Sequence, residues 1–329
     1  MKSWLETRWY ASVPPPILLR GLSRLYRLVA ERRRMRLSQA ATPLPVPVIV
    51  VGNISVGGTG KTPFVIWLVE HLREWGFRPG VVSRGYGGRA PAYPFRVTAD
   101  SDPSCSGDEP LLIARRGACP VMVDPDRSAA AHALLARGDV DLIVADDGLQ
   151  HYRLARDLEI CVIDGARGLG NGALLPAGPL REPSARLHEV GLVVVNGAGW
   201  DDATLRPLRM HLAADRVWPL AGGAQRTLQS FAGQAVHAVA GIGNPSRFFD
   251  SLRAAGIVVR EHAFADHHRY SAADLAFGDE LPLLMTEKDA MKCMSFARPH
   301  WWAVAVSAQL SPPDAARVQE SATGLRNTR

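Results

Sequence analysis

The chain has 329 residues, of which 47% are hydrophobic, and a formal net charge of +6 at pH 7. This length allows one large or two ordinary domains, and this apolar content excludes wholesale disorder. No run is apolar for long enough to cross a membrane, the first residues lack the pattern of a signal peptide, and the four cysteines show no metal or redox spacing. The charge leaves nucleic acid, an anionic membrane or a phosphorylated substrate as partners, and its position along the chain decides between them.

Residues 1–40 are expected to form a basic amphipathic arm. Four apolar residues share one helical face: Leu18, Leu22, Leu25 and Val29. Seven arginines are opposed only by Glu31: Arg20, Arg24, Arg27, Arg32, Arg33, Arg34 and Arg36. This pattern favours a helix that associates with an anionic membrane surface. The alternative is a helix that packs on its own domain with a solvated basic face. Nucleic acid is disfavoured, because no recognisable nucleic-acid module is present.

A phosphate-binding loop follows the arm, between an apolar run at 46–51 and a helix-like pattern from residue 63. The loop residues are Ser55, Val56, Gly57, Gly58, Thr59, Gly60, Lys61 and Thr62. The glycines let backbone N–H groups surround an anion, and the following helix adds its positive dipole end. Lys61 would reach the β- and γ-phosphates of a nucleoside triphosphate, and the Thr62 hydroxyl would bind Mg²⁺. The alternative is a glycine-rich turn that binds nothing.

Strands and helices alternate from residue 41 to 200, which predicts a doubly wound parallel sheet of the P-loop NTPase type. Besides the first strand, strands are expected at 78–83, 117–123, 140–145, 158–164 and 190–196, and a helix at 127–137. The strand at 140–145 runs into Asp146 and Asp147, as in a Walker B sequence. These carboxylates would lie beside the phosphate loop and hold Mg²⁺.

The remainder of the chain is expected to add a second, smaller α/β domain over 233–329, after a connection at 201–232 with short strands of its own. Its strands are expected at 235–240, 257–264, 283–286 and 302–306, with a helix at 245–255. The polar tail after residue 311 is expected to be frayed. We detect no internal repeat.

Several classes of P-loop protein can be discounted. Residues 286–289 have the wrong order for a guanine-binding motif, and Val56 stands where partitioning ATPases have a lysine. A kinase for a small molecule or a lipid remains, and it needs cations on the transferred phosphoryl group and a base for the acceptor hydroxyl. Lys61 and Arg84 are candidate cations, and Asp108 and His267 are candidate bases. Asp108 could instead cap a helix near residue 110, and His267 could be a capping or surface histidine.

Eight motifs between residues 51 and 290 occur in a fixed order: 51–63, 83–87, 107–110, 146–151, 175–182, 241–243, 266–267 and 286–290. Together they resemble the tetraacyldisaccharide 4′-kinase family, the lipid A 4′-kinases of Gram-negative bacteria. The resemblance implies transfer of the γ-phosphate of ATP, with Mg²⁺, to the 4′-hydroxyl of a tetraacylated glucosamine disaccharide 1-phosphate. It also implies a peripheral protein at the cytoplasmic face of the inner membrane, without nucleic acid or an obligate protein partner.

The resemblance also implies roles for single residues. Asp108 would be the base, and His267 would pair with it from the second domain. Five further residues would contribute to substrate sites, although turn roles stay open for the two that follow the Walker B strand: Arg84, Tyr86, Gln150, His151 and Glu182. A substrate with four acyl chains does not leave a bilayer cheaply, which gives the basic arm a purpose. The alternative from another class is a membrane-associated regulatory ATPase that acts through a protein partner.

Overall fold

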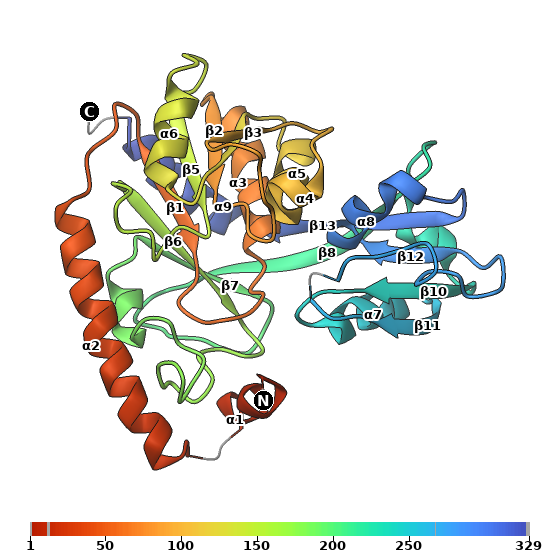
Figure 1. The fold of residues 1–329 in the computed structure, drawn as a ribbon, viewed down its shortest axis with the longest axis horizontal. Coiled ribbons are helices and arrows are strands. Elements are labelled where there is room, and N and C mark those ends of the chain that lie inside the picture. The colour runs from red at the N-terminus through yellow and green to blue at the C-terminus, as the bar shows by residue number, and fades with distance from the viewer. Residues whose placement is uncertain (1, 12–13, 267, 327–329) are drawn as a thin grey trace.

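The computed structural model describes residues 2–11, 14–266 and 268–326. Within these ranges the strands form one continuous mixed sheet, shown in Figure 1, with the order β11-β10-β12-β13-β8-β7-β6-β1-β5-β2-β4-β3 and with β9 paired to β8. Two lobes are visible along this sheet. The P-loop lobe contains β1 to β7, and the small lobe contains β10 to β12.

The P-loop lobe is a parallel sheet covered on both faces. Its parallel strands are β1 (Val48–Gly52), β2 (Pro79–Ser83), β4 (Val121–Val123), β5 (Leu142–Asp146), β6 (Leu158–Asp164) and β7 (Leu192–Asn196), and β3 (Phe95–Val97) pairs antiparallel at the edge. Its helices are α3 (Lys61–Glu74), α4 (Pro103–Ser106), α5 (Asp108–Arg116), α6 (Arg127–Leu135) and the short η1 (Ser184–His188). Alternate residues of β1 enter two different cores, one shared with α3 and α5 and the other with α6. The doubly wound prediction is therefore confirmed.

A long antiparallel ribbon joins the two lobes. It consists of β8 (Leu208–Pro219) and β13 (Trp301–Leu310), which run between the lobes in Figure 1. Short β9 (Arg226–Thr227) and η2 (Leu228–Phe231) follow β8. The expectation of only short strands at 201–232 is wrong, because β8 has 12 residues. The division of the chain into domains at 41–200, 201–232 and 233–329 stays a prediction.

The small lobe repeats the α/β pattern on a smaller scale. Its parallel strands are β10 (Ala235–Ala240), β11 (Val258–Ala263) and β12 (Leu283–Thr286). Its helices are α7 (Pro245–Ala254), α8 (Glu287–Cys293) and the short η3 (Met294–Phe296). Two phenylalanines and a leucine of α7 fill a separate core beneath β10. These elements lie close to where the sequence pattern places them.

The C-terminal segment is a helix, so the expectation of a frayed tail is wrong. Helix α9 (Pro312–Gly324) begins at Ser311, whose side chain accepts a hydrogen bond from the amide of Asp314. Val318 and Ala322 are buried in the same core as α3. These residues therefore pack on the P-loop lobe, although the sequence pattern grouped them with the smaller domain.

The N-terminal arm contains α1 (Lys2–Trp9) and α2 (Ile17–Gln39), and α2 lies along the P-loop lobe in Figure 1. A polar face attaches it: the Ser23 hydroxyl donates to the carbonyl of Leu174 at 2.7 Å, and the Tyr26 hydroxyl donates to that of Arg181 at 3.0 Å. The apolar residues turn outward and are 46–86% exposed: Ile17, Leu18, Leu22, Leu25, Leu28, Val29 and Met35. The helix therefore packs on its own domain, as the alternative expected, but with a polar face, and its apolar face is exposed. Its association with a membrane stays a prediction. None of the described helices is long and apolar enough to span a bilayer.

Candidate active site

The phosphate loop occupies the turn between β1 and α3. Gly57 and Gly60 have φ values of 104° and 92°, a left-handed conformation that favours glycine. Gly60 is the N-cap of α3, and Lys61 is its first residue. The backbone amide of Val56 donates to the carbonyl of Pro179 at 2.9 Å, which holds the entry of the loop. The loop thus presents the amide groups and the dipole of a helix N-terminus at its open side.

The Walker B carboxylates lie beside this loop, because β1 and β5 are neighbours and Val51 pairs with Asp146. The Lys61 ammonium is 3.5 Å from Asp147 Oδ1. Burial would raise the pKa of Asp147, but Lys61 and Arg181 bring it below its ordinary value. Asp146 is 1% exposed, and burial, followed by the charges of Glu109 and Asp147, raises its pKa to about 7. Asp146 therefore holds a proton more readily than an ordinary carboxylate, whereas Asp147 does not.

The oxygen atoms at this point fit a magnesium ion. Asp146 Oδ1 and Asp147 Oδ1 are buried and have no hydrogen-bond partner among the described residues. Carboxylate and hydroxyl oxygens are ligands that Mg²⁺ prefers. No group of three or more His, Cys, Asp or Glu side chains in the described chain is arranged to hold a metal. Phosphate oxygens would therefore have to complete a set begun by Thr62, Asp146 and Asp147.

The candidate base lies where the two lobes meet. Gly107 is the N-cap of α5 and Asp108 is its first residue, so the capping alternative for Asp108 is wrong. Its Oδ2 is 3.2 Å from the ammonium of Lys292 on α8. Four residues earlier, Lys288 donates to Glu109 at 2.9 Å. His267 lies outside the described residues, so its pairing with Asp108 stays a prediction.

The two lysines of α8 were missed as site residues, although the recognised motif at 286–290 contains Lys288. Their spacing of four residues places both on one face of a helix, which is a readable signal. What the spacing does not reveal is that this face meets α5. Burial would raise the pKa of Glu109, but Lys288 and Lys61 lower it. Glu109 is therefore a charged link between α8 and the phosphate loop.

Two further arginines approach Asp147 and were also missed. Arg181 Nη1 is 3.7 Å from Asp147 Oδ2, and Arg127 Nη2 is 3.5 Å from the Asp147 carbonyl. Burial, followed by the charge of Arg84, lowers the pKa of Arg127. The predicted residues Arg84 and Tyr86 are both exposed, and the charge of Arg84 acts on Arg127. Such a collection of cations around two carboxylates suits a polyphosphate with its metal ion.

Three predicted substrate residues mainly contact other side chains and backbone of the protein. They are Gln150, His151 and Glu182. Gln150 Nε2 donates to Glu182 Oε1 at 2.6 Å, and the Tyr152 hydroxyl donates to the other oxygen at 2.5 Å. His151 Nε2 accepts from the Arg127 amide at 3.2 Å, and burial, followed by the charge of Arg127, lowers its pKa to about 4. These contacts favour positioning of the loops over direct contact with a substrate.

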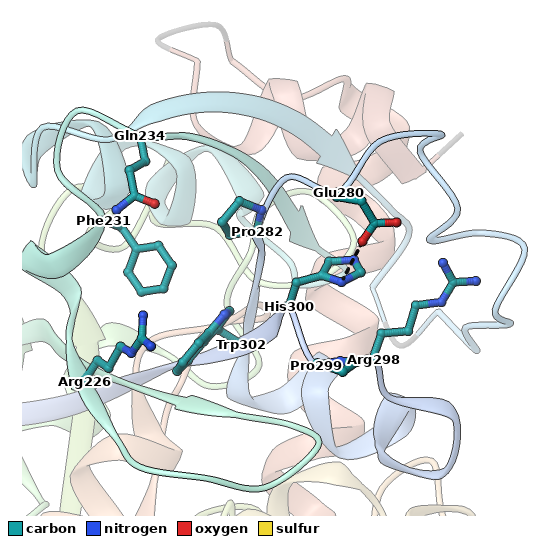
Figure 2. A pocket seen from close by; sticks show the side chains of 9 residues that line it. All are labelled: Arg226, Phe231, Gln234, Glu280, Pro282, Arg298, Pro299, His300 and Trp302. Atoms are coloured by element: carbon teal, nitrogen blue, oxygen red, sulfur yellow. Dashed lines mark ion pairs between the residues drawn. The ribbon is translucent and has the colours of Figure 1, made fainter.

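A separate pocket lies in the small lobe, at the amino ends of β10, β12 and β13. Its volume is about 560 Å³. Figure 2 shows Arg226 and Phe231 beside Trp302; the guanidinium of Arg226 is 4.8 Å from the centroid of the Trp302 ring. None of the described site residues lines this pocket. The phosphate loop follows the carboxyl end of β1, so the pocket and the candidate active site are different places.

Comparison with known proteins identifies the family. The model of a family described as tetraacyldisaccharide-1-P 4′-kinase matches residues 16–322. Relatives named tetraacyldisaccharide 4′-kinase from Pseudomonas putida strain F1 and Pseudomonas aeruginosa strain LESB58 are each 54% identical over 312 residues, which is 94% of this chain and 93% of theirs. The chain belongs to this kinase family.

A solved structure of this family has the same fold as this chain. LpxK from Aquifex aeolicus, in a crystal structure in complex with ATP, has a TM-score of 0.77 and 27% identity, over 93% of this chain and 97% of that one. The resemblance found in the motifs is therefore confirmed, and so are the P-loop fold and the classification of this member of the tetraacyldisaccharide-1-P 4′-kinase family as a kinase.

Proposed function

We propose that this chain transfers the γ-phosphate of ATP to the 4′-hydroxyl of a tetraacylated glucosamine disaccharide 1-phosphate, a step of lipid A biosynthesis. One observation of the structure supports this most directly. The charges of Lys61 and Asp147 act on Glu109, and the next residue to Glu109 in α5 is Asp108, a buried carboxylate paired with Lys292 from the other lobe. A donor site and a base for an acceptor are what phosphoryl transfer to an alcohol needs.

In the proposed reaction, the 4′-oxygen attacks the γ-phosphorus, the bond from phosphorus to the bridging oxygen of ADP breaks, and the hydroxyl proton passes to the Asp108 carboxylate. Lys61 and the loop amides hold the phosphates, and Arg127 and Arg181 add positive charge at their side. Mg²⁺, held by Thr62, Asp146 and Asp147, supplies charge neutralisation when bound. His267 is proposed to orient Asp108.

The remaining site residues are proposed to act on the acceptor side or to support it. Arg84 and Tyr86 are exposed next to the site and are available to contact the sugar or its phosphate. Gln150, His151 and Glu182 are proposed to fix the start of α6, which carries Arg127, and the segment that carries Arg181, since their side chains contact these segments or each other.

The arm is proposed to bring the enzyme to the cytoplasmic face of the bacterial inner membrane as a peripheral protein. Its support is the outward-facing apolar stripe of α2 together with the arginines of the same helix. Each methylene buried in the bilayer contributes about 0.8 kcal/mol, and each basic residue near an anionic surface contributes about 1 kcal/mol. This proposal includes no nucleic acid and no obligate protein partner. Family membership disfavours the regulatory ATPase.

The test is incubation of the protein with γ-labelled ATP, Mg²⁺ and the acylated disaccharide 1-phosphate in mixed micelles. We expect label on the lipid from the wild type and about 10²- to 10³-fold less from Lys61→Ala, because a cation on the transferred group is lost. Rapid ATP hydrolysis without lipid, unchanged by the disaccharide and without labelled lipid, would falsify the kinase proposal and favour the regulatory ATPase.

A further inference from the structure

Arg247, near the start of α7 in the small lobe, contacts the P-loop lobe at the ends of two strands. We propose that Arg247 is a positioning residue that couples the small lobe to the phosphate loop through Asn196, so that ATP affinity depends on this contact. The proposal rests on the proposed function in that the loop binds ATP. It adds a residue outside the loop and outside the Walker B strand.

The first step is the relay itself. Arg247 Nη2 donates to Asn196 Oδ1 at 3.0 Å, and Asn196 Nδ2 donates to the carbonyl of Thr59 in the phosphate loop at 3.1 Å. A guanidinium only donates and a carbonyl only accepts, so the two partners fix the orientation of the Asn196 amide between them. Asn196 is 1% exposed, and water therefore does not replace either partner easily.

The second step is the packing of Asn196 on the loop. A Cβ atom at Gly60 would come within 2.6 Å of Asn196 Nδ2, so the amide lies directly against the residue before Lys61. Gly60 already has a left-handed φ of 92°. A movement of Asn196 would therefore be transmitted to the N-cap of α3 and to the lysine that follows it.

The third step concerns the other terminal nitrogen of the Arg247 guanidinium, Nη1. Arg247 Nη1 donates to Asp164 Oδ2 at 3.4 Å, at the end of β6. The other oxygen of Asp164 accepts the amides of Ala166 and Arg167 at 3.0 and 3.1 Å. The Arg167 guanidinium in turn lies 3.3 Å from where a Cβ at Gly57 would be. Through Asn196 and Asp164, one arginine is thus linked to both sides of the loop, and a lysine does not reproduce this forked geometry.

The contact is positional rather than a large source of stability. The Arg247 side chain is 42% exposed, and an exposed ion pair contributes little to the free energy of folding. Its proposed role is to orient the Asn196 amide against the phosphate loop. By linkage, if the contact strengthens ATP binding, bound ATP strengthens the contact of the small lobe by the same factor.

The experiment measures Mg-ATP affinity of the full chain by titration calorimetry, without lipid. We expect Arg247→Ala to weaken binding about 5- to 30-fold, Arg247→Lys to recover only part of this loss, and the melting temperature to stay within about 2 °C. Arg253→Ala is the matched control. It lies on the same helix, pairs with Asp250 and Glu261, and should keep wild-type affinity.

A double-mutant cycle tests the relay. In Asn196→Ala the path from Arg247 to Thr59 is already broken, and only the longer 3.4 Å contact of Arg247 with Asp164 remains. Adding Arg247→Ala should therefore weaken ATP binding by less than about 2-fold more. Losses that multiply, or unchanged ATP affinity in Arg247→Ala, would overturn the proposal. In the wild type, ATP should slow amide hydrogen exchange at residues 245–254, and unchanged exchange would also overturn it. None of these measurements needs the lipid, so a failure of lipid phosphorylation is a separate result.

Discussion

The donor half and the acceptor half of the proposed site are built in different ways. The donor half comes from neighbouring strands of one lobe, with the loop after β1 and the carboxylates at the end of β5. The acceptor half joins Asp108 on α5 to Lys292 on α8, residues that are far apart in the chain and belong to different lobes. The donor half is therefore encoded locally, whereas the acceptor half exists only when the lobes meet.

The largest expected effect separates the two halves by removing the base. Asp108→Asn should lower kcat about 10²- to 10⁴-fold, because an amide does not accept the hydroxyl proton. The Kd of Mg-ATP should change less than about 2-fold, since the donor half is untouched. Single-turnover transfer to the lipid and calorimetric ATP titration measure the two quantities.

Lys61→Ala is the matched counterpart in the donor half, and it should weaken ATP binding as well as turnover. Near-normal kcat in Asp108→Asn would remove the base from the acceptor half. An ATP affinity that falls together with kcat in Asp108→Asn would show that the two halves are not separable.

The next effect concerns how the acceptor reaches its half of the site. The combined change Leu18→Gln, Leu22→Gln and Leu25→Gln alters three outward-facing residues of α2, so folding should be unaffected. Binding to vesicles with anionic lipid should fall about 10²-fold or more, because each buried leucine contributes about 1.5–3 kcal/mol. Vesicle flotation measures this, and the KM for ATP should stay unchanged.

A polar change elsewhere on the surface serves as the control for the arm. Val258→Gln alters an exposed apolar residue of the small lobe and should leave vesicle binding as it is. Equal binding of the triple variant and the wild type would contradict the membrane role of α2.

A smaller effect is expected at Lys292, the lysine of the acceptor half that joins the two lobes. Lys292→Met should lower kcat about 10-fold, because the ammonium 3.2 Å from Asp108 Oδ2 orients the carboxylate and balances its charge. ATP affinity should change little. A variant whose ATP affinity falls as much as its kcat would place Lys292 in the donor half instead.

The difference between features encoded locally and features formed by distant contacts also explains how much could be predicted from the sequence. The central strands β1, β5 and β7 of the P-loop lobe are fully buried apolar runs, and the loop and the Walker B aspartates are contiguous patterns, so they could be recognised one by one. Strand β8 alternates only in part, because its middle residues are half-buried between the lobes, and its length was missed. Helix α9 looks polar, yet Ser311 and Asp314 form a readable cap and two small apolar residues suffice to dock it.

The site residues missed from the sequence share one property. Lys292, Arg127, Arg181 and Arg247 acquire their roles from partners distant in the chain, and a single sequence carries no record of such pairs. The apolar stripe of α2 shows the same limit in another form. Periodicity identified the face, but only the structure shows that this face turns away from the protein.

The smallest expected effect tests how firmly the donor half is held at low pH. The pKa of His151 is lowered to about 4 in the folded protein, below its ordinary value near 6.5, so between these pH values the unfolded chain binds the extra proton. Folding stability should therefore fall as the pH drops, by about 2 kcal/mol between pH 7 and pH 5 from this residue. In His151→Gln the side-chain carbonyl can still accept the Arg127 amide, but the titrating imidazole is gone. Its free energy of unfolding, measured in urea at both pH values, should therefore fall less from pH 7 to pH 5 than that of the wild type, by about the contribution of His151. His188→Gln, at an exposed site, should behave as the wild type does. If His151→Gln unfolds with the wild-type pH dependence, the turn after the Walker B strand owes its acid sensitivity to another group.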